Sequence, residues 1–213
     1  MKIYEIISES VHDQHIFKAV FTAGAPGSGK STIAQKLFAG TGLKELNVDK
    51  FWELYNKLGR HENYPRFHLL TQMQKRNFLS GRLGLIIDGT GRRLDRIKSI
   101  KDELDELGYD TAMVFVNTDL ETSLARVQRR SELTGRTIDP EKVTEFWNAT
   151  QNNLTYFQNI FGRQFYIVDN NNEPNLDFVN AKLERWLIQK PTKPPAVNWI
   201  RSQLMRQNTY ETI

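Results

Sequence analysis

Short apolar stretches and longer amphipathic stretches alternate along most of the chain. The apolar stretches contain many β-branched and aromatic residues and show no polar face. This pattern is typical of strands that are buried on both sides of a parallel sheet. The strands predicted in this way are 17–23, 43–48, 83–87, 111–116 and 164–169.

Between these strands, apolar residues recur three and four positions apart, which predicts helices with one buried face. Leu94, Ile97 and Leu104 form one such stripe, and Gly108 is placed to end their helix. One predicted helix carries the stripe Phe51, Leu54, Tyr55 and Leu58. The other predicted helices are 32–38, 66–80, 94–107, 118–133, 139–161 and 176–188.

Two of the helix starts carry capping signals. Thr118 followed three residues later by Glu121 predicts a capping box, in which each side chain bonds the other's backbone N–H. Asp139 followed by Pro140 predicts a second start, because aspartate is a favoured cap and proline fits the first helical position. We expect that second helix to run through Phe161.

The alternation of strands and helices predicts an α/β fold, a parallel sheet with helices on both faces. The predicted organisation is an N-terminal extension over 1–16, one domain over 17–190 and a C-terminal tail over 191–213, where three prolines interrupt the pattern. The tail has two interpretations. Its apolar residues at 197, 200 and 204 fit a short docked helix, and a disordered segment is the other possibility.

Composition narrows the class of protein. The 213 residues include 39% hydrophobic residues and no cysteine, so a sizeable core is possible and disulfides and thiolate metal sites are excluded. No apolar run approaches the roughly 18 residues of a membrane span, and the first residues make a poor signal peptide, so we expect a cytoplasmic protein without membrane association. A net charge of +4 is compatible with an anionic partner.

The strongest local pattern is a glycine-rich loop between the first predicted strand and helix. Gly24, Gly29, Lys30 and Ser31 match G-x-x-x-x-G-K-[ST]. Such a loop turns backbone N–H groups around phosphates, while the lysine adds a charge and the serine hydroxyl can bind Mg²⁺. A chance glycine-rich turn is disfavoured because motif and context agree. The residues assigned to the nucleotide are Gly24, Ala25, Pro26, Gly27, Ser28, Gly29, Lys30, Ser31 and Thr32.

Two aspartates follow the second and third strands, at the edge where ligands bind in parallel sheets. Asp88 is predicted to orient Mg²⁺ together with Ser31, and its alternative role is to cap the following helix. Asp49 is predicted to accept the proton of an attacking hydroxyl as a general base. Its alternative role is also a helix cap.

Arginines gather on one face of the helix that begins near residue 119. Arg126, Arg129 and Arg130 repel one another at this spacing, and a polyanion would turn that repulsion into attraction. Arginines supplied within the chain stabilise the charge that develops in phosphoryl transfer. We assign this role to Arg126, Arg130 and Arg136, and which of them reaches the phosphates stays open. A solvated basic face is the alternative.

Aromatic and basic residues interleave between residues 49 and 81, a composition that suits a base or a nucleotide acceptor. Trp52 stands out because it lies off the apolar stripe of its helix. Arg92 and Arg93 form a second basic cluster directly after Asp88. Trp52, Arg92 and Arg93 are therefore the predicted substrate-binding residues.

These motifs resemble those of P-loop kinases of the zeta toxin and polynucleotide kinase branch, over roughly residues 17–188. The resemblance rests on the glycine loop, Asn47-Val-Asp49, Ile86-Ile-Asp-Gly-Thr90 and the arginines from 126 to 136. It implies a three-layer P-loop NTPase fold of the kinase type, with five parallel strands in order 2-3-1-4-5 under an arginine-bearing lid. It also implies transfer of the γ-phosphate of ATP, with GTP as the alternative and Mg²⁺ as the metal. Asp49 would then be the base.

Members of this branch differ in their acceptors, which are nucleotide-linked amino sugars, nucleic-acid 5′-hydroxyls, or modified uracil in the DNA of some phages. The expected acceptor here is a hydroxyl of a nucleotide or of nucleic acid. A nucleotide-sugar kinase is the second hypothesis, and a nucleotide-binding regulatory module is the third. The region where zeta toxins commonly bind the acceptor is shorter in this chain, and no phosphatase domain follows. The oligomeric state is left open.

Overall fold

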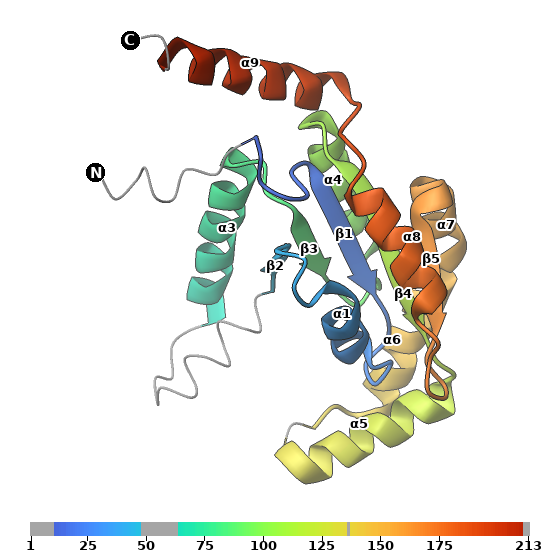
Figure 1. Ribbon diagram of the computed structural model, residues 1–213. Helices are drawn as coiled ribbons and strands as arrows, with labels where there is room; N and C mark the ends of the chain where they lie inside the picture. Colours follow the sequence, from blue (N-terminus) through green and yellow to red (C-terminus); the bar gives the residue numbers. More distant parts are fainter. Residues whose placement is uncertain (1–10, 48–63, 136, 211–213) are drawn as a thin grey trace.

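A computed structural model describes residues 11–47, 64–135 and 137–210 of the chain. Within these residues, five strands form one all-parallel sheet in the order β2-β3-β1-β4-β5 (Figure 1). The predicted strands and their spatial order are therefore confirmed. The strands are β1 Lys18–Ala23, β2 Lys44–Leu46, β3 Leu85–Asp88, β4 Asp110–Asn117 and β5 Phe165–Asp169.

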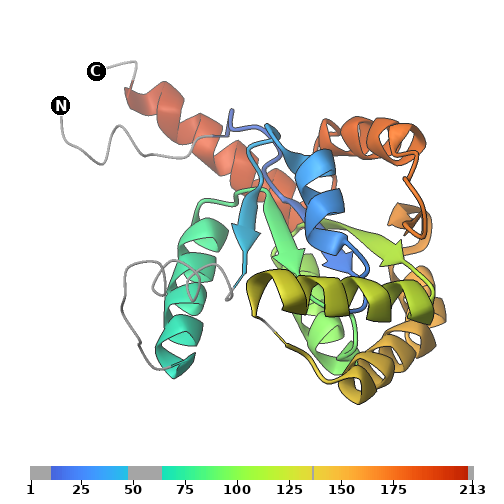
Figure 2. The ribbon, with the colours of Figure 1, turned by 90° about the horizontal axis from the view of Figure 1, so that it is seen from below.

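Helices cover both faces of the sheet, so the described chain has the three layers that were expected (Figures 1 and 2). One apolar core lies between the sheet and helices α1 and α8, and the other lies between the sheet and helices that include α4 and α7. The helices are α1 Lys30–Phe38, α3 Tyr64–Ser80, α4 Leu94–Glu106, α5 Leu120–Thr134, α6 Pro140–Asn152, α7 Leu154–Phe161, α8 Asp177–Leu187 and α9 Pro194–Tyr210, with a short 3-10 helix at Gly162–Gln164.

The central strand β1 shows why the sequence pattern was apolar without a polar face. Successive side chains of a strand point to opposite sides of the sheet. Ala19 and Phe21 lie in one core, and Val20 lies in the other. Because both sides of β1 are covered, every residue of the strand is buried.

The predicted capping box at the start of α5 is wrong by one residue. The cap is Asp119, whose carboxylate accepts a hydrogen bond from the backbone N–H of Thr122 at 2.6 Å. That backbone hydrogen bond lowers the pKa of Asp119 below its ordinary value. Thr118 is buried, and its hydroxyl is engaged with the hydroxyl of Ser123 at 2.8 Å, so it is not available as a cap.

The predicted helix over 139–161 is two helices, α6 and α7, which meet at Asn153. The start is as predicted, since Asp139 accepts a hydrogen bond from the N–H of Glu141 at 2.9 Å. At the break, the Asn153 amide donates to the carbonyl of Gly91 at 2.9 Å and to that of Arg92 at 3.1 Å. The break therefore fastens the loop that follows β3.

Of the two interpretations of the tail, the helix is correct, because α9 docks on the body of the protein. Ala196 is fully buried, and its backbone N lies only 2.7 Å from where a side chain on Gly108 would begin. Gly108 also has a φ of +93°, so glycine is required there for two reasons. Trp199 packs edge-on against Phe17, with ring centroids 5.5 Å apart.

Replacing Trp199 with alanine should destabilise the fold by about 2 kcal/mol, less than for a fully buried aromatic residue because the indole is only partly covered. Urea unfolding would measure the change. The matched control is Arg201→Ala, an exposed position on the same helix, for which we expect a change within about 0.5 kcal/mol. Equal stability of the two variants would show that the packing of Trp199 does not stabilise the fold.

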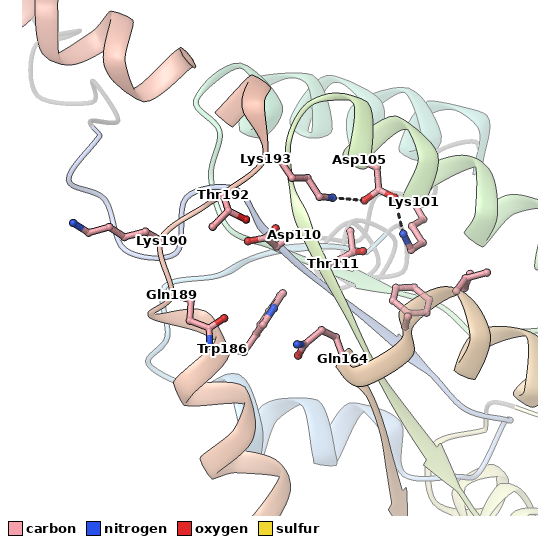
Figure 3. A pocket seen from close by; sticks show the side chains of 12 residues that line it. Lys101, Asp105, Asp110, Thr111, Gln164, Trp186, Gln189, Lys190, Thr192 and Lys193 are labelled. Atoms are coloured by element: carbon pink, nitrogen blue, oxygen red, sulfur yellow. Dashed lines mark hydrogen bonds and ion pairs between the residues drawn. The ribbon is translucent and has the colours of Figure 1, made fainter. Parts of the chain in front are cut away.

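A cavity of about 340 Å³ lies at the amino ends of β4 and β5, where Asp110 and Gln164 contribute to its lining (Figure 3). Its main charges pair within the protein.

Asp105 accepts from Lys101 at 2.6 Å and from Lys193 at 2.7 Å. Burial by itself would raise the pKa of Asp105, but the hydrogen bonds from these two lysines outweigh it, so the pKa is lowered. The stabilisation from Asp105 is therefore present at neutral pH and is lost as the pH falls through its folded-state pKa.

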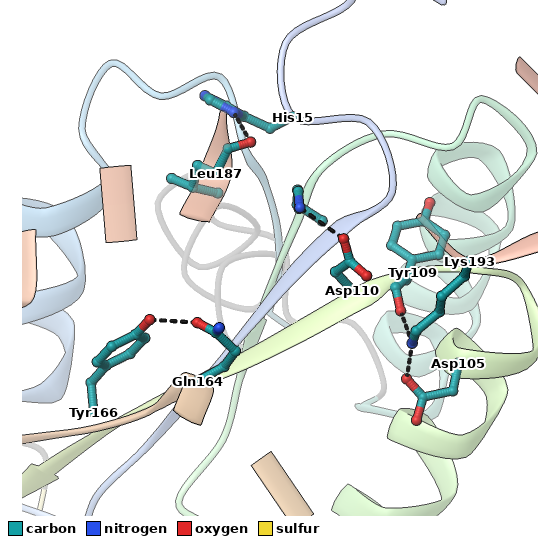
Figure 4. A network of polar contacts seen from close by, with 9 residues as sticks. His15, Asp105, Tyr109, Asp110, Gln164, Tyr166, Leu187 and Lys193 are labelled. Atoms are coloured by element: carbon teal, nitrogen blue, oxygen red, sulfur yellow. Dashed lines mark hydrogen bonds and ion pairs between the residues drawn. The ribbon is translucent and has the colours of Figure 1, made fainter. Parts of the chain in front are cut away.

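The same end of the sheet holds an ion pair whose lysine is deeply buried (Figure 4). Lys18 has a side chain only 1% exposed and binds Asp110 at 2.8 Å. Its ammonium also lies 4.9 Å from the centre of the Trp186 ring. Nearby, Lys193 donates to Asp105 and to the Tyr109 carbonyl, and these contacts fasten the start of α9. It lies at the edge opposite to the one where ligands bind in parallel sheets.

Candidate active site

The glycine loop lies at the carboxyl end of β1, between β1 and the first turn of α1. Gly27 and Gly29 adopt φ angles of +83° and +80°, a region that other residues rarely enter. The surroundings also exclude side chains at both positions. A side chain on Gly27 would begin 2.3 Å from the carbonyl oxygen of Ser123, and one on Gly29 would begin 2.3 Å from the amide nitrogen of Asn170. The loop is thus held in one shape from two sides.

Helix α1 begins at Lys30, directly after Gly29. The first amides of a helix have no partner within the helix, and the helix dipole places partial positive charge at this end. A loop of glycines that leads into a helix N-terminus is an anion-binding arrangement.

Lys30 and Asp88 form an ion pair across the carboxyl end of the sheet, and their side chains are only 13% and 19% exposed. The Thr22 hydroxyl donates to the same carboxylate oxygen of Asp88 at 2.7 Å. The Asn47 amide donates to the other oxygen at 3.0 Å. Two donors from the ends of β1 and β2 and one from the start of α1 therefore orient the Asp88 carboxylate.

The alternative role of Asp88 as a helix cap is not what the structure shows. Helix α4 begins at Leu94, and its N-terminal cap is Arg93, whose side chain makes no capping hydrogen bond. Asp88 instead faces Lys30 at the end of the glycine loop, and its role in orienting Mg²⁺ remains a prediction.

Arg126 reaches the glycine loop from α5, the helix that lies beyond the arrowheads of the strands in Figure 1. Its Nη1 atom is 3.8 Å from the position where a side chain on Gly29 would begin. Among the described residues, this buried nitrogen has no hydrogen-bond partner. The other terminal nitrogen donates to the carbonyl of Asn171 at 3.3 Å. A buried guanidinium nitrogen without a partner, beside a phosphate-type loop, is suited to an anion.

The remaining predicted site residues are less closely tied to this loop. Arg130 is exposed on the same helix. Arg92 lies over the ring of Phe146 at 4.0 Å, and Arg93 pairs with Asp95 at 3.4 Å. The assignment of Arg92 and Arg93 to the substrate, and of Arg130 to the phosphates, remains a prediction. The predicted residues Asp49, Trp52 and Arg136 lie outside the described residues.

Sequence reasoning assigned no site role to the asparagines around the loop, although Asn47 belongs to one of the quoted motifs. Asn170 and Asn171 follow β5 directly, and Asn47 follows β2. Their amides contact the glycine loop, the Arg126 helix and Asp88. Position after a strand, the same signal that singled out Asp88, could have identified them.

The donors present fit a magnesium ion. Ser31 lies in the first turn of α1, next to Lys30, and Lys30 pairs with Asp88. One hydroxyl and one carboxylate are therefore available near the glycine loop as metal ligands. Hard oxygen ligands of this kind suit Mg²⁺, which is usually held by one or two carboxylates together with phosphates and waters. Across 11–47, 64–135 and 137–210 there is no group of three or more histidine, cysteine or acidic side chains for a different metal cage.

The strand order and the glycine loop after the central strand define the P-loop kinase class of folds. The model of the zeta toxin family matches residues 5–180, so the chain belongs to the zeta toxin family. Comparison with curated proteins found no significant match. In the part of the chain that the structure describes, no helix is long and apolar enough to cross a lipid bilayer.

Solved structures share the fold at low sequence identity. A protein described as a kinase from Chloroflexus aurantiacus has a TM-score of 0.61 and 15% identity, covering 81% of this chain and 98% of that one. A chain of the PezAT toxin–antitoxin system of Streptococcus pneumoniae has a TM-score of 0.55 and 17% identity, covering 95% and 89%. A chain of the Pnkp1/Rnl/Hen1 RNA repair complex has a TM-score of 0.55 and 22% identity, covering 72% and 49%.

Proposed function

We propose that this protein is a Mg²⁺- and ATP-dependent kinase that transfers the γ-phosphate to a hydroxyl of a nucleotide or nucleic acid. The observation that carries the proposal is the pair of cations at one loop. Lys30 lies at its end, and the unpartnered nitrogen of Arg126 is buried beside Gly29. Membership of the zeta toxin family and the fold that this chain shares with a protein described as a kinase support phosphotransfer.

In this mechanism, the loop amides hold the phosphate chain of the nucleotide, and Lys30 exchanges its contact with Asp88 for a contact with the β- and γ-phosphates. Asp88, kept oriented by Thr22 and Asn47, is then available with Ser31 for the metal. Mg²⁺, when bound, neutralises charge on the phosphate oxygens. Arg126 stabilises the negative charge that spreads over the transferred group.

Asp49 acts as the general base, since it follows β2, which neighbours β3 and Asp88 in the sheet. The acceptor hydroxyl gives its proton to the Asp49 carboxylate while its oxygen bonds to the γ-phosphorus. The bond from that phosphorus to the β,γ-bridging oxygen breaks, and ADP leaves.

Replacing Asp49 with asparagine should lower kcat by about 10²- to 10⁴-fold, the contribution typical of a general base, and leave ATP affinity within about twofold. Single-turnover transfer from labelled ATP and calorimetric ATP binding would measure the two effects. Asp102→Asn, an exposed carboxylate on α4, is the control. If the protein is a regulatory module without turnover, the Asp49 change should alter neither phosphate transfer nor ATP binding.

The acceptor has two candidates. The excess of basic residues favours nucleic acid, and the family match favours a nucleotide sugar of the kind that zeta toxins phosphorylate. A panel of DNA, RNA, nucleosides and UDP-N-acetylglucosamine with labelled ATP would identify it. Salt gives a second criterion, because the affinity for DNA falls steeply with log salt when several phosphates are contacted, whereas a small nucleotide sugar should show little slope.

A further inference from the structure

The turn after β5 holds the glycine loop in its phosphate-binding shape, and we propose that Asn170 is the positioning residue that does so. This inference deepens the proposed function, because it says which side chain sets the direction of a backbone N–H in the nucleotide site. The Asn170 side-chain amide donates to the carbonyl of Ser28 at 2.7 Å. The residue is only 8% exposed, and its own backbone N–H is bound to the carbonyl of Asn117 at 2.9 Å.

The Ser28 carbonyl and the Gly29 N–H belong to the same peptide unit. The described residues contain no cis peptide bond, and in a trans peptide the carbonyl and the N–H point in opposite directions. Because Asn170 holds the Ser28 carbonyl on its own side, the Gly29 N–H must point to the other side of the loop. A peptide that rotated by half a turn would present an oxygen to the phosphates instead of a donor.

Glycine at position 29 makes such a rotation easy, since glycine crosses conformations that other residues avoid. The local sequence therefore does not fix the orientation of the peptide that joins Ser28 to Gly29, and a hydrogen bond from elsewhere in the chain is required. Asn170 supplies it from 142 residues away along the chain.

The neighbouring residue ties the same turn to the arginine helix. The Asn171 side chain accepts from the N–H of Asp119 at 2.8 Å, directly before α5, and its carbonyl accepts from Arg126. The backbone of α5 in turn packs against Gly27. The β5–α8 turn thus positions the loop amides and Arg126 together.

Nucleotide binding by Asn170→Ala tests the proposal. The loop backbone and its lysine cradle the β- and γ-phosphates, so ADP affinity should fall about tenfold, the effect of leaving one buried hydrogen-bonding group unpaired. AMP affinity should stay within about twofold, and the ADP-to-AMP affinity ratio should therefore fall. In turnover, KM for ATP should rise with little change in kcat, since the same donor contacts the phosphates in the ground state and in the transition state. A role confined to stability would lower the unfolding temperature without changing the ADP-to-AMP ratio.

Two further variants keep the test decisive. Asn170→Ser retains a polar group but is too short to reach Ser28, so it should reproduce the loss if the alanine variant folds poorly. Asn175→Ala lies on the same connection and removes only a contact to the N–H of Asp177 at 2.9 Å, so its ADP affinity should match the wild type. Unchanged ADP binding by a folded Asn170 variant overturns this inference and leaves the kinase proposal intact. Failure of the wild-type protein to bind ADP or ATP overturns the kinase proposal itself.

Discussion

Replacing Lys30 with methionine should abolish phosphotransfer, with a fall in kcat/KM of at least about 10³-fold. Methionine keeps an unbranched stem of similar length and removes the charge. The loss follows because a preorganised charge that faces the developing negative charge contributes about 3–4 kcal/mol to transition-state stabilisation. ATP affinity should fall as well, because the ammonium contacts the β- and γ-phosphates in the ground state.

The fold should tolerate this change. Asp88 loses its ion-pair partner but keeps the hydrogen bonds from Thr22 and Asn47, so we expect the free energy of unfolding to fall by no more than about 2 kcal/mol. Lys36→Met is the matched control, since Lys36 is exposed on the same helix and faces no carboxylate of the site. Activity of Lys30→Met within tenfold of wild type would exclude the glycine loop as the catalytic phosphate site.

Replacing Arg126 with methionine should lower kcat by about 10²- to 10³-fold while the Kd for ATP rises only a few-fold. An arginine that contacts the transferred group acts mainly in the transition state, where the charge spreads over the equatorial oxygens. Arg126→Lys should recover only part of the activity, because lysine lacks the planar, forked donor. Pre-steady-state transfer from labelled ATP would separate the chemical step from binding.

Arg129→Met is the matched control for Arg126, since Arg129 is exposed on the same helix and its loss removes the same charge from α5. If the two variants lose activity equally, α5 contributes a general basic field and not one catalytic guanidinium. If Arg130→Met has the larger effect, the assignment moves one turn along the helix.

Much of the fold could be predicted from local patterns. The strands β1, β3 and β4 were recognisable because they are buried on both faces, as central parallel strands must be, whereas the edge strands β2 and β5 each keep exposed residues. The order of the strands came from the resemblance to P-loop kinases and was confirmed. The errors concern helix ends. The cap is Asp119 where Thr118 was predicted, because the Thr118 hydroxyl is buried against Ser123, a tertiary contact that no local pattern shows.

The candidate site divides in the same way. The glycine loop and Asp88 could be identified because residue type and position after a strand carry the signal. Asn170 could not be assigned its role, because its partner Ser28 is 142 residues away and only the sheet brings the two together. The break at Asn153, which fastens the loop after β3, was missed for the same reason.

The sequence by itself determined the alternation of strands and helices, the glycines of the loop and the charges placed at strand ends. These features depend on periodicity and on local backbone freedom, which neighbouring residues encode. The tertiary structure alone decided that Lys30 pairs with Asp88, that Arg126 lies against Gly29, and that Asn170 orients the Ser28 peptide. Those contacts join residues far apart in the chain, and they form because parallel strands bring their carboxyl ends to one edge of the sheet.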